Sequence, residues 1–270
     1  MDPTEAMPQD TPDDWPEPVE IVNPDGASDI VLLCEHASNH IPAAYAGLGL
    51  TPDDLSRHIA WDIGAAEVTR RLSALLDAPA FLGTTSRLLI DLNRPLDAPS
   101  SIVTRSEDTD IPGNVDLDRL ERDHRAKRIF RPFHTAVSRH LDRRQHEGRF
   151  VRLVSIHSFT PVFKGVSRPW TGGVLFDRAE AFGRSVIAHL RQAGLHVEAN
   201  VPYTSDRAED FAVPIHGDDR GIPAILIEIR NDLIRDGVDA TNWGVELWAA
   251  RLNAALRQGS GIAQDRDNPL

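Results

Sequence analysis

The chain has 270 residues and a net charge of −12, with 29 Lys and Arg against 41 Asp and Glu. Its hydrophobic content of 41% is that of an ordinary globular protein with a sizeable core. The acidic excess argues against a nucleic-acid binder and against a protein of anionic membrane surfaces. No apolar run approaches the roughly 18 residues of a membrane span.

The basic residues and the single cysteine indicate which ligands and which cell compartment suit the protein. Lys127 and Lys164 are the only lysines, and arginine binds small anions bidentately, so a pocket for a small anionic substrate remains open. Cys34 has no partner for an intrachain disulfide. The first basic residue is Arg57, which argues against a secretory or transit signal. We therefore expect a cytoplasmic protein.

Residues 1–28 are acidic and rich in proline, without a periodic apolar pattern. This composition predicts a disordered or loosely draped arm up to about Asp25. Residues 29–270 are expected to form one domain. Within it, short runs rich in Val, Ile and Leu predict buried strands. These runs are Ile30–Cys34, Leu88–Leu92, Val151–Ile156, Val174–Phe176, Val197–Val201 and Ala224–Ile229.

Segments with helical spacing lie between several of these runs. Asp62 and Thr241 are suited to begin helices, and Pro132 is expected to break or kink the helix that contains it. The predicted helices are Ile63–Leu76, Leu117–Gln145, Ala179–Ala193 and Thr241–Leu256. Four histidines in the Arg-rich second helix are interpreted as part of a solvated face: His124, His134, His140 and His146.

The alternation of strands and helices predicts an α/β fold. We expect a single three-layer domain in which helices flank a mixed, mostly parallel sheet. Ligands of such sheets bind beyond the carboxyl ends of the strands. Polar residues do gather directly after five of the predicted strands, where they include histidines, carboxylates and arginines. This clustering favours an enzyme.

His36 and His157 are the best candidates for metal ligands, because each follows or ends a buried run. A catalytic zinc ion takes three protein ligands and keeps one open position. Asp62 is the preferred third ligand, and Glu35 is kept as a rival or as an outer partner of a ligand. The alternative is that all four are ordinary polar residues at strand ends. The expected cofactor is zinc or another divalent transition metal.

The remaining candidate residues suit hydrolysis of a substrate that carries a carboxylate. Glu228 is flanked by apolar residues, so burial should raise its pKa toward that of a general base. Arg94 can bind a carboxylate bidentately, and Arg87 can stabilise an oxyanion. The alternatives are structural ion pairs of Glu228 with an arginine and of Arg87 with Asp91.

The sequence offers two weaker candidates for substrate contacts and lacks several motifs of other protein classes. Arg230 and His216 are further candidate substrate contacts, although His216 is more typical of a loop histidine. The sequence lacks the Gly-x-Ser-x-Gly motif of one class of serine hydrolases. It also lacks the glycine-rich motifs of nucleotide-binding proteins.

Several stretches together resemble the N-formylglutamate amidohydrolase family. They occur in the expected order and span about Ile30 to Ile234. The stretches are Cys34-Glu35-His36-Ala37-Ser38-Asn39 with Ile41-Pro42, Trp61-Asp62-Ile63-Gly64, Ser86-Arg87, Asp91-Leu92-Asn93-Arg94, Ile156-His157-Ser158-Phe159 and Glu228-Ile229-Arg230-Asn231-Asp232-Leu233.

The resemblance implies an architecture similar to that of zinc carboxypeptidases and aspartoacylase. It implies that His36 and His157 hold zinc, and that Asn93 and Arg94 hold the carboxylate of the substrate. Arg87 would polarise the scissile carbonyl, and Glu228 would activate the attacking water. The implied substrate is a small acidic N-acyl amino acid, above all N-formyl-L-glutamate, and the implied role is in amino-acid catabolism, specifically histidine degradation.

The chain departs from the carboxypeptidase pattern at one point. That pattern pairs a histidine with a glutamate three residues later, whereas His36 is followed at that distance by Asn39. The third ligand is therefore an open choice between Asp62 and Glu35. Two other hypotheses stay open, namely a zinc hydrolase of another N-acyl amino acid or short peptide and a non-catalytic carboxylate-binding relative.

Overall fold

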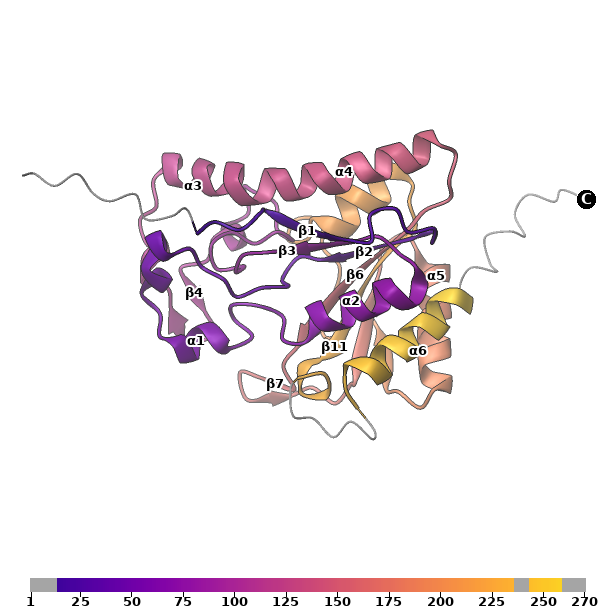
Figure 1. Cartoon of the computed structure of the whole chain (residues 1–270). Helices are drawn as coiled ribbons and strands as arrows, with labels where there is room; N and C mark the ends of the chain where they lie inside the picture. Colours follow the sequence, from indigo (N-terminus) through magenta and orange to yellow (C-terminus); the bar gives the residue numbers. More distant parts are fainter. Residues whose placement is uncertain (1–13, 236–242, 259–270) are drawn as a thin grey trace, which may run out of the picture.

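A computed structural model describes residues 14–235 and 243–258 of the chain (Figure 1). A seven-stranded sheet forms its centre, with strand order β1-β3-β2-β6-β11-β9-β10. The strands are β1 Val19–Val22, β2 Ile30–Cys34, β3 Ala80–Gly83, β6 Arg152–Phe159, β9 Gly172–Leu175, β10 Val197–Ala199 and β11 Ala224–Arg230. Two small hairpins lie outside this sheet, β4 Arg105–Ser106 with β5 Thr109–Asp110 and β7 Val162–Phe163 with β8 Val166–Ser167.

The sheet is mixed and mostly parallel, as predicted. The four inner strands β3, β2, β6 and β11 run parallel to one another. Strand β1 is antiparallel to β3, and β9 is antiparallel to β11 but parallel to β10. The carboxyl ends of β2, β6 and β11 therefore open on the same edge, where side chains that follow them can meet.

Helices cover both faces of the sheet and make the three-layer α/β fold that the sequence predicts (Figure 1). One core joins the sheet to α2, α5 and α6, and a second core joins its other face to α4. None of the helices in the described ranges combines the length and the apolar composition that crossing a bilayer requires. The helices are α1 Pro52–Ser56, α2 Ala65–Leu76, α3 Arg119–Arg125, α4 Arg131–His146, α5 Glu180–Gln192 and α6 Val245–Gln258.

Several expected elements differ in the structure. The run Leu88–Leu92 is buried but forms turns, while the strand in this part of the chain is β3. The expectation of a loose arm is wrong for residues 19–22, which form β1 and pair with β3. Residues 1–13 and the predicted helix start Thr241 lie outside the described residues. The predicted helix 117–145 changes to a π-helical turn, Ala126–Phe130, just before Pro132. Its regular hydrogen bonding is interrupted there as expected, while the backbone stays helical.

The solvated histidine face is wrong for two of its four members. His124 and His146 are exposed, but His134 and His140 are buried because α4 lies across the sheet and turns them toward the second core. The His134 Nδ1 atom lies 2.8 Å from Nε2 of His216. Its Nε2 atom donates to the Leu92 carbonyl at 2.8 Å. Both rings are buried, which disfavours a positive charge on either of them.

This buried pair predicts a loss of stability in mild acid. Burial lowers the pKa of His134 to about 3 and that of His216 to about 4, whereas an unfolded histidine titrates near 6.5. The unfolded chain therefore binds more protons below pH 6.5, so the stabilising contribution is complete above that pH and is lost as the pH falls. The slope is roughly 1.4 kcal/mol per pH unit for each histidine.

We expect His134→Gln, which keeps a donor for Leu92 but cannot titrate, to flatten this slope. Between pH 7 and pH 5 its free energy of unfolding should fall by about 1–2 kcal/mol less than that of the wild type. Urea denaturation at several pH values measures the difference. The exposed His124→Gln variant is the control and should follow the wild type. Parallel curves for wild type and His134→Gln would contradict the prediction.

Candidate active site

A cavity of about 550 Å³ opens at the carboxyl ends of β2, β6 and β11. Residues from several distant parts of the sequence line it, as the strand-end pattern predicts. Seven of the residues predicted for the site are among them: His36, Asp62, Arg87, Asn93, Arg94, His157 and Glu228.

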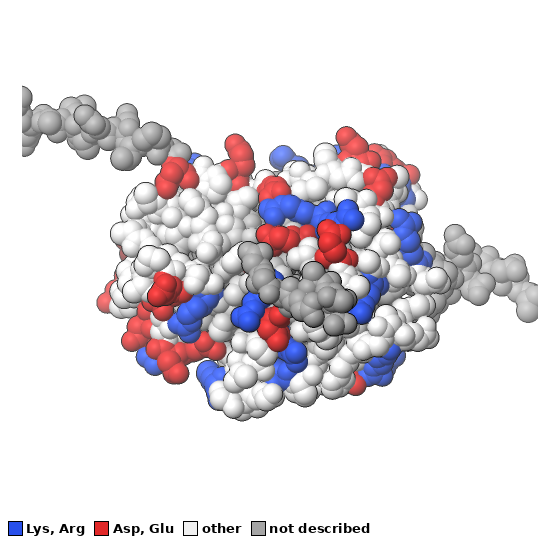
Figure 2. All heavy atoms as spheres, turned by 60° about the horizontal axis from the view of Figure 1, so that its bottom comes forward, with Lys and Arg blue, Asp and Glu red and all other residues white. Residues whose placement is uncertain are grey.

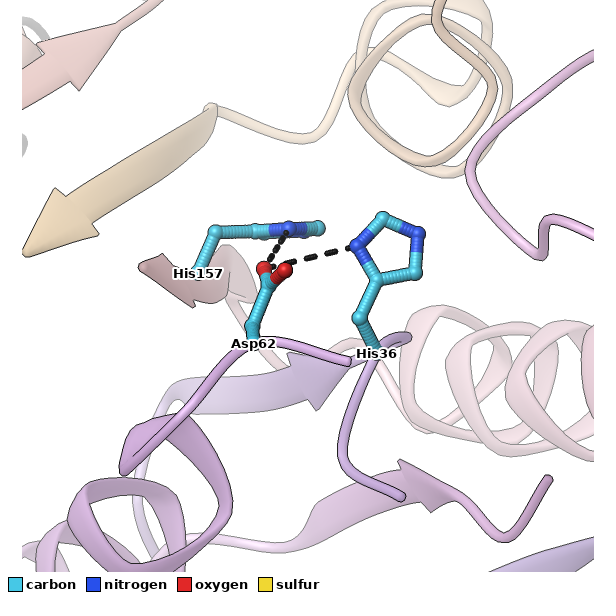
Figure 3. Close-up of side chains that lie close together, drawn as sticks. All are labelled: His36, Asp62 and His157. Atoms are coloured by element: carbon cyan, nitrogen blue, oxygen red, sulfur yellow. Dashed lines mark hydrogen bonds and ion pairs between the residues drawn. The ribbon is translucent and has the colours of Figure 1, made fainter. Parts of the chain in front are cut away.

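His36, Asp62 and His157 form a compact group of potential metal ligands at the base of the cavity (Figure 3). One donor atom from each lies within 4.8 Å of the others, and all three side chains are buried. The Asp62 Oδ2 atom lies 2.8 Å from His157 Nδ1 and 3.4 Å from His36 Nδ1. Two imidazole nitrogens and one carboxylate oxygen are a donor set that suits zinc.

Each histidine of this group also has a carboxylate at its outer nitrogen. His36 Nε2 lies 2.7 Å from Asp91 Oδ1, and His157 Nε2 lies 3.0 Å from Glu35 Oε2. Metal-binding histidines usually have such partners, which fix the orientation of the ring. The two Nδ1 atoms therefore face Asp62, and Glu35 occupies the outer position that the sequence left as an alternative.

The backbone around Asp62 holds its carboxylate in this place. The Asp62 N–H donates to the His36 carbonyl at 2.9 Å, and the Ser158 N–H donates to Asp62 Oδ2 at 3.2 Å. Gly64 adopts φ +79° just before α2, and a Cβ atom there would lie 2.5 Å from the Ile234 carbonyl oxygen. The Asp62-Ile63-Gly64 stretch therefore needs its glycine for both conformation and space.

The charges of the group stabilise one another. Burial raises the pKa of Asp62, but the adjacent His36 and His157 rings outweigh it and hold that pKa well below its usual range. Burial likewise opposes the charged form of His157, but hydrogen bonds with Asp62 and Glu35 raise its pKa well above its usual value. The site is thus built to hold positive charge between buried carboxylates, as a metal-ligand set requires.

Glu228 lies beside the metal-ligand group, on the neighbouring strand. The parallel register of β11 and β6 pairs Glu228 with His157, so the two side chains leave the same face of the sheet. Burial raises the pKa of Glu228 to about 7. Its Oε2 atom is buried and has no hydrogen-bond partner within the described part of the chain. A carboxyl group of this kind can both accept and return a proton near neutral pH.

On its other side Glu228 faces a residue without a side chain. The antiparallel register of β11 and β9 pairs Glu228 with Gly173. A Cβ atom at Gly173 would lie 1.7 Å from the Val201 carbonyl oxygen. The backbone that leads to Pro202 and Tyr203, two wall residues of the cavity, therefore packs directly on the sheet.

Arg87 binds Asp91, the carboxylate behind His36, and also approaches Asp62 of the metal-ligand group. Its Nε and Nη2 atoms donate to Asp91 Oδ2 at 3.1 and 2.7 Å, and its Nη1 atom lies 3.4 Å from Asp62 Oδ1. The expected ion pair with Asp91 thus exists. Asp91 is buried, however, and its other oxygen contacts His36, so the pair belongs to the site and is not a surface salt bridge.

Asn93 and Arg94 also line the cavity. The Asn93 Oδ1 atom accepts from the Phe211 and Ala212 N–H groups at 3.3 and 2.9 Å, which leaves the side-chain NH₂ group for a ligand. Arg94 Nη1 donates to Asp210 Oδ1 at 3.1 Å and to the Glu209 carbonyl. The rest of the Arg94 guanidinium can donate to an anion.

Two predicted contacts lie away from the cavity wall. His216 packs against His134 in the second core, and Arg230 pairs with Asp232 at 2.8 Å. Sequence reasoning placed Tyr203 at the end of the predicted strand Val197–Val201 but missed the rest of the wall segment after β10, because it carries no apolar periodicity. This segment contributes Tyr203, Thr204, Asp206, Glu209 and Asp210.

Comparisons with known proteins show the family of the chain. Residues 28–235 match the family described as N-formylglutamate amidohydrolase. The chain belongs to this family. It is therefore an amidohydrolase, and the family is expected to act on a small molecule. A comparison with the sequences of curated proteins gives no match.

Two solved structures resemble the chain over most of its length. A gene product of Agrobacterium tumefaciens is 38% identical with a TM-score of 0.86, and the alignment covers 91% of this chain and 96% of that one. N-formylglutamate amidohydrolase from Ralstonia eutropha is 20% identical with a TM-score of 0.72, covering 93% and 100%. The second likeness supports the fold that the sequence predicts.

The metal-ligand group yields a direct test by elemental analysis. We expect about one zinc ion per purified wild-type chain and its loss in His157→Ala, because the variant removes one of three ligands. Inductively coupled plasma mass spectrometry after dialysis against dilute zinc measures the ratio. His146→Ala, at an exposed position, is the control and should keep the metal. Full zinc content in His157→Ala would contradict the assignment.

Proposed function

We propose that the protein is a metal-dependent amidohydrolase that cleaves the N-formyl amide of an acidic amino acid, with N-formyl-L-glutamate as the leading substrate. The observation that carries the proposal is the meeting of three kinds of group in one cavity. They are the His36–Asp62–His157 group, the carboxyl group of Glu228, and the Asn93–Arg94 wall.

The residues at the base of the cavity fit a zinc ion. His36, Asp62 and His157 would hold it, with Asp91 and Glu35 orienting the two histidines. A bound ion of this kind polarises a carbonyl oxygen and lowers the pKa of a coordinated water to about 7. In this proposal Asp62, two residues before the N-cap of α2, supplies the carboxylate that the carboxypeptidase pattern takes from a glutamate near its first histidine.

Glu228 acts as the general base and acid. It accepts a proton from the attacking water as the new C–O bond forms at the acyl carbon. It then donates this proton to the amine nitrogen as the C–N bond breaks, so that formate and the free amino acid result. A pKa of about 7 suits both transfers.

Arg87 and Arg94 have separate roles in this mechanism. Arg87, held by Asp91 beside the metal-ligand group, stabilises the negative charge that develops on the acyl oxygen. Arg94 and the Asn93 NH₂ group bind the α-carboxylate of the substrate. The substrate amide then lies between Glu228 and Arg87.

A second substrate class has one observation in its favour. Asp206, Glu209 and Asp210 give the cavity an anionic wall, which would suit an N-acyl amino acid with a basic side chain. This alternative keeps the chemistry of Glu228 and changes only the side chain of the substrate. Kinetic comparison of N-formyl amino acids distinguishes the two classes.

Replacing Glu228 tests the proposed mechanism. We expect Glu228→Gln, which cannot accept a proton, to lower kcat by about 10²–10⁴-fold while its zinc content equals that of the wild type. Formate release from N-formyl-L-glutamate measures kcat, and elemental analysis measures the zinc. Glu209→Gln is the control, because Glu209 lines the same cavity but bonds Ser100. Near-normal turnover by Glu228→Gln would exclude its role as the base.

A further inference from the structure

A second cavity of about 230 Å³ adjoins the catalytic one. The two share Arg87, Arg94 and Tyr203 as walls. Beyond these, the second cavity is lined by residues of the 100–107 region, by Phe163 and Lys164 of the β7–β8 hairpin, and by His58, Ile59, Leu88 and Asp91. A substrate whose α-carboxylate is bound by Arg94 therefore lies at the junction of two spaces into which its side chain can extend.

The two spaces differ in charge. The catalytic cavity is also lined by Asp206, Glu209 and Asp210. Asp210 pairs with Arg94 at 3.1 Å, whereas Asp206 and Glu209 pair with no cation of the described residues and repel a second carboxylate. The adjoining cavity carries Lys164. Figure 2 shows acidic and basic side chains intermingled on the face that carries the hairpin. A charged side chain there is available to a ligand only if it forms no ion pair with a neighbouring side chain.

Pairing leaves Lys164 as the available cation of the adjoining cavity. Its acidic residues are already neutralised, because Asp91 pairs with Arg87 at 2.7 Å and Glu107 pairs with Arg57 at 3.1 Å. The Lys164 ammonium lies 5.5 Å from the centroid of the Phe163 ring. Within the described ranges, no carboxylate pairs with it.

The hairpin that carries Lys164 is anchored at its base. The buried Arg168 guanidinium lies 4.5 Å from the Phe163 ring centroid, 4.9 Å from that of Tyr203 and 5.8 Å from that of Phe159. These cation–π contacts tie the hairpin to the shared wall and to the end of β6. The position of the hairpin over the cavity is thus fixed by packing.

The hairpin turn is unusual for its residue type. Lys164 and Gly165 adopt φ +47° and +78°, and two-residue turns of this kind favour Asn, Asp or Gly at both positions. Lysine at the first position carries a conformational cost, which points to a use for its side chain.

We propose that Lys164 is a specificity-determining residue that binds the side-chain carboxylate of an acidic N-acyl amino acid in the adjoining cavity. The proposal rests on the proposed function, since it assigns the distal end of the same substrate. It also explains how an acidic side chain avoids the anionic wall of the catalytic cavity.

The test compares N-formyl-L-glutamate with N-formyl-L-glutamine, its neutral isostere. For the wild type we expect kcat/KM to favour the glutamate compound by about tenfold or more, which corresponds to roughly 1.4 kcal/mol. Lys164→Met should bring this ratio close to one by raising KM for N-formyl-L-glutamate, with little change in kcat. Lys127→Met removes the only other lysine, which pairs with Asp123 at 2.6 Å, and should keep the wild-type ratio.

Charge reversal adds a second arm to the test. Lys164→Glu should prefer N-formyl-L-lysine to N-formyl-L-glutamate. Three outcomes would overturn the inference alone: turnover by the wild type without preference for the glutamate compound, an unchanged ratio in Lys164→Met, or a wild-type preference for N-formyl-L-lysine. A wild-type preference for N-formyl-L-lysine would indicate that the side chain of the substrate binds at the wall formed by Asp206, Glu209 and Asp210. Failure of the zinc-loaded wild type to cleave any N-formyl amino acid would overturn the proposed function, and the inference with it.

Discussion

The site depends on one buried carboxylate that lies between two imidazole rings. Asp62 Oδ2 faces the Nδ1 atoms of His36 and His157, which come from two adjacent parallel strands. Burying a carboxylate is costly unless positive charge and hydrogen bonds compensate. The histidines supply part of this compensation only because Asp91 and Glu35 fix their rings from outside. A metal ion at the inner position would complete it.

The same electrostatic arrangement separates the roles of the carboxyl groups. Asp62, Asp91 and Glu35 each contact a histidine, and the pKa of each is held below its usual value. Glu228 lies on the next strand without such a contact, and burial brings its pKa to about 7. Environments that push the pKa values of nearby carboxyl groups apart are how one site obtains both ligands and a base.

Sequence reasoning located the site because parallel strands bring their carboxyl ends together. His36, His157 and Glu228 follow or end buried runs, and each lines the cavity. Other features depend on contacts between distant parts of the chain, which local sequence patterns do not show. The apolar run Leu88–Leu92 is as hydrophobic as a strand, but it is buried in turns under α3 and α4. The apolar spacing of Phe133, Val137 and Leu141 does mark the face of α4 that meets the sheet. Histidine suits buried and exposed positions alike, so the burial of His134 beside this face was missed.

The packing of Gly173 against the Val201 carbonyl has a consequence for how this site can change over evolution. The contact is between main chains, so it constrains only one side chain, the absent one at Gly173. This contact fixes the backbone at the start of the wall segment that follows Val201. The side chains of Tyr203 and Thr204 take no part in this contact, whereas those of Asp206 and Asp210 bond backbone N–H groups of the segment itself. Substrate preference can thus diverge in this segment while the geometry around Glu228 stays the same.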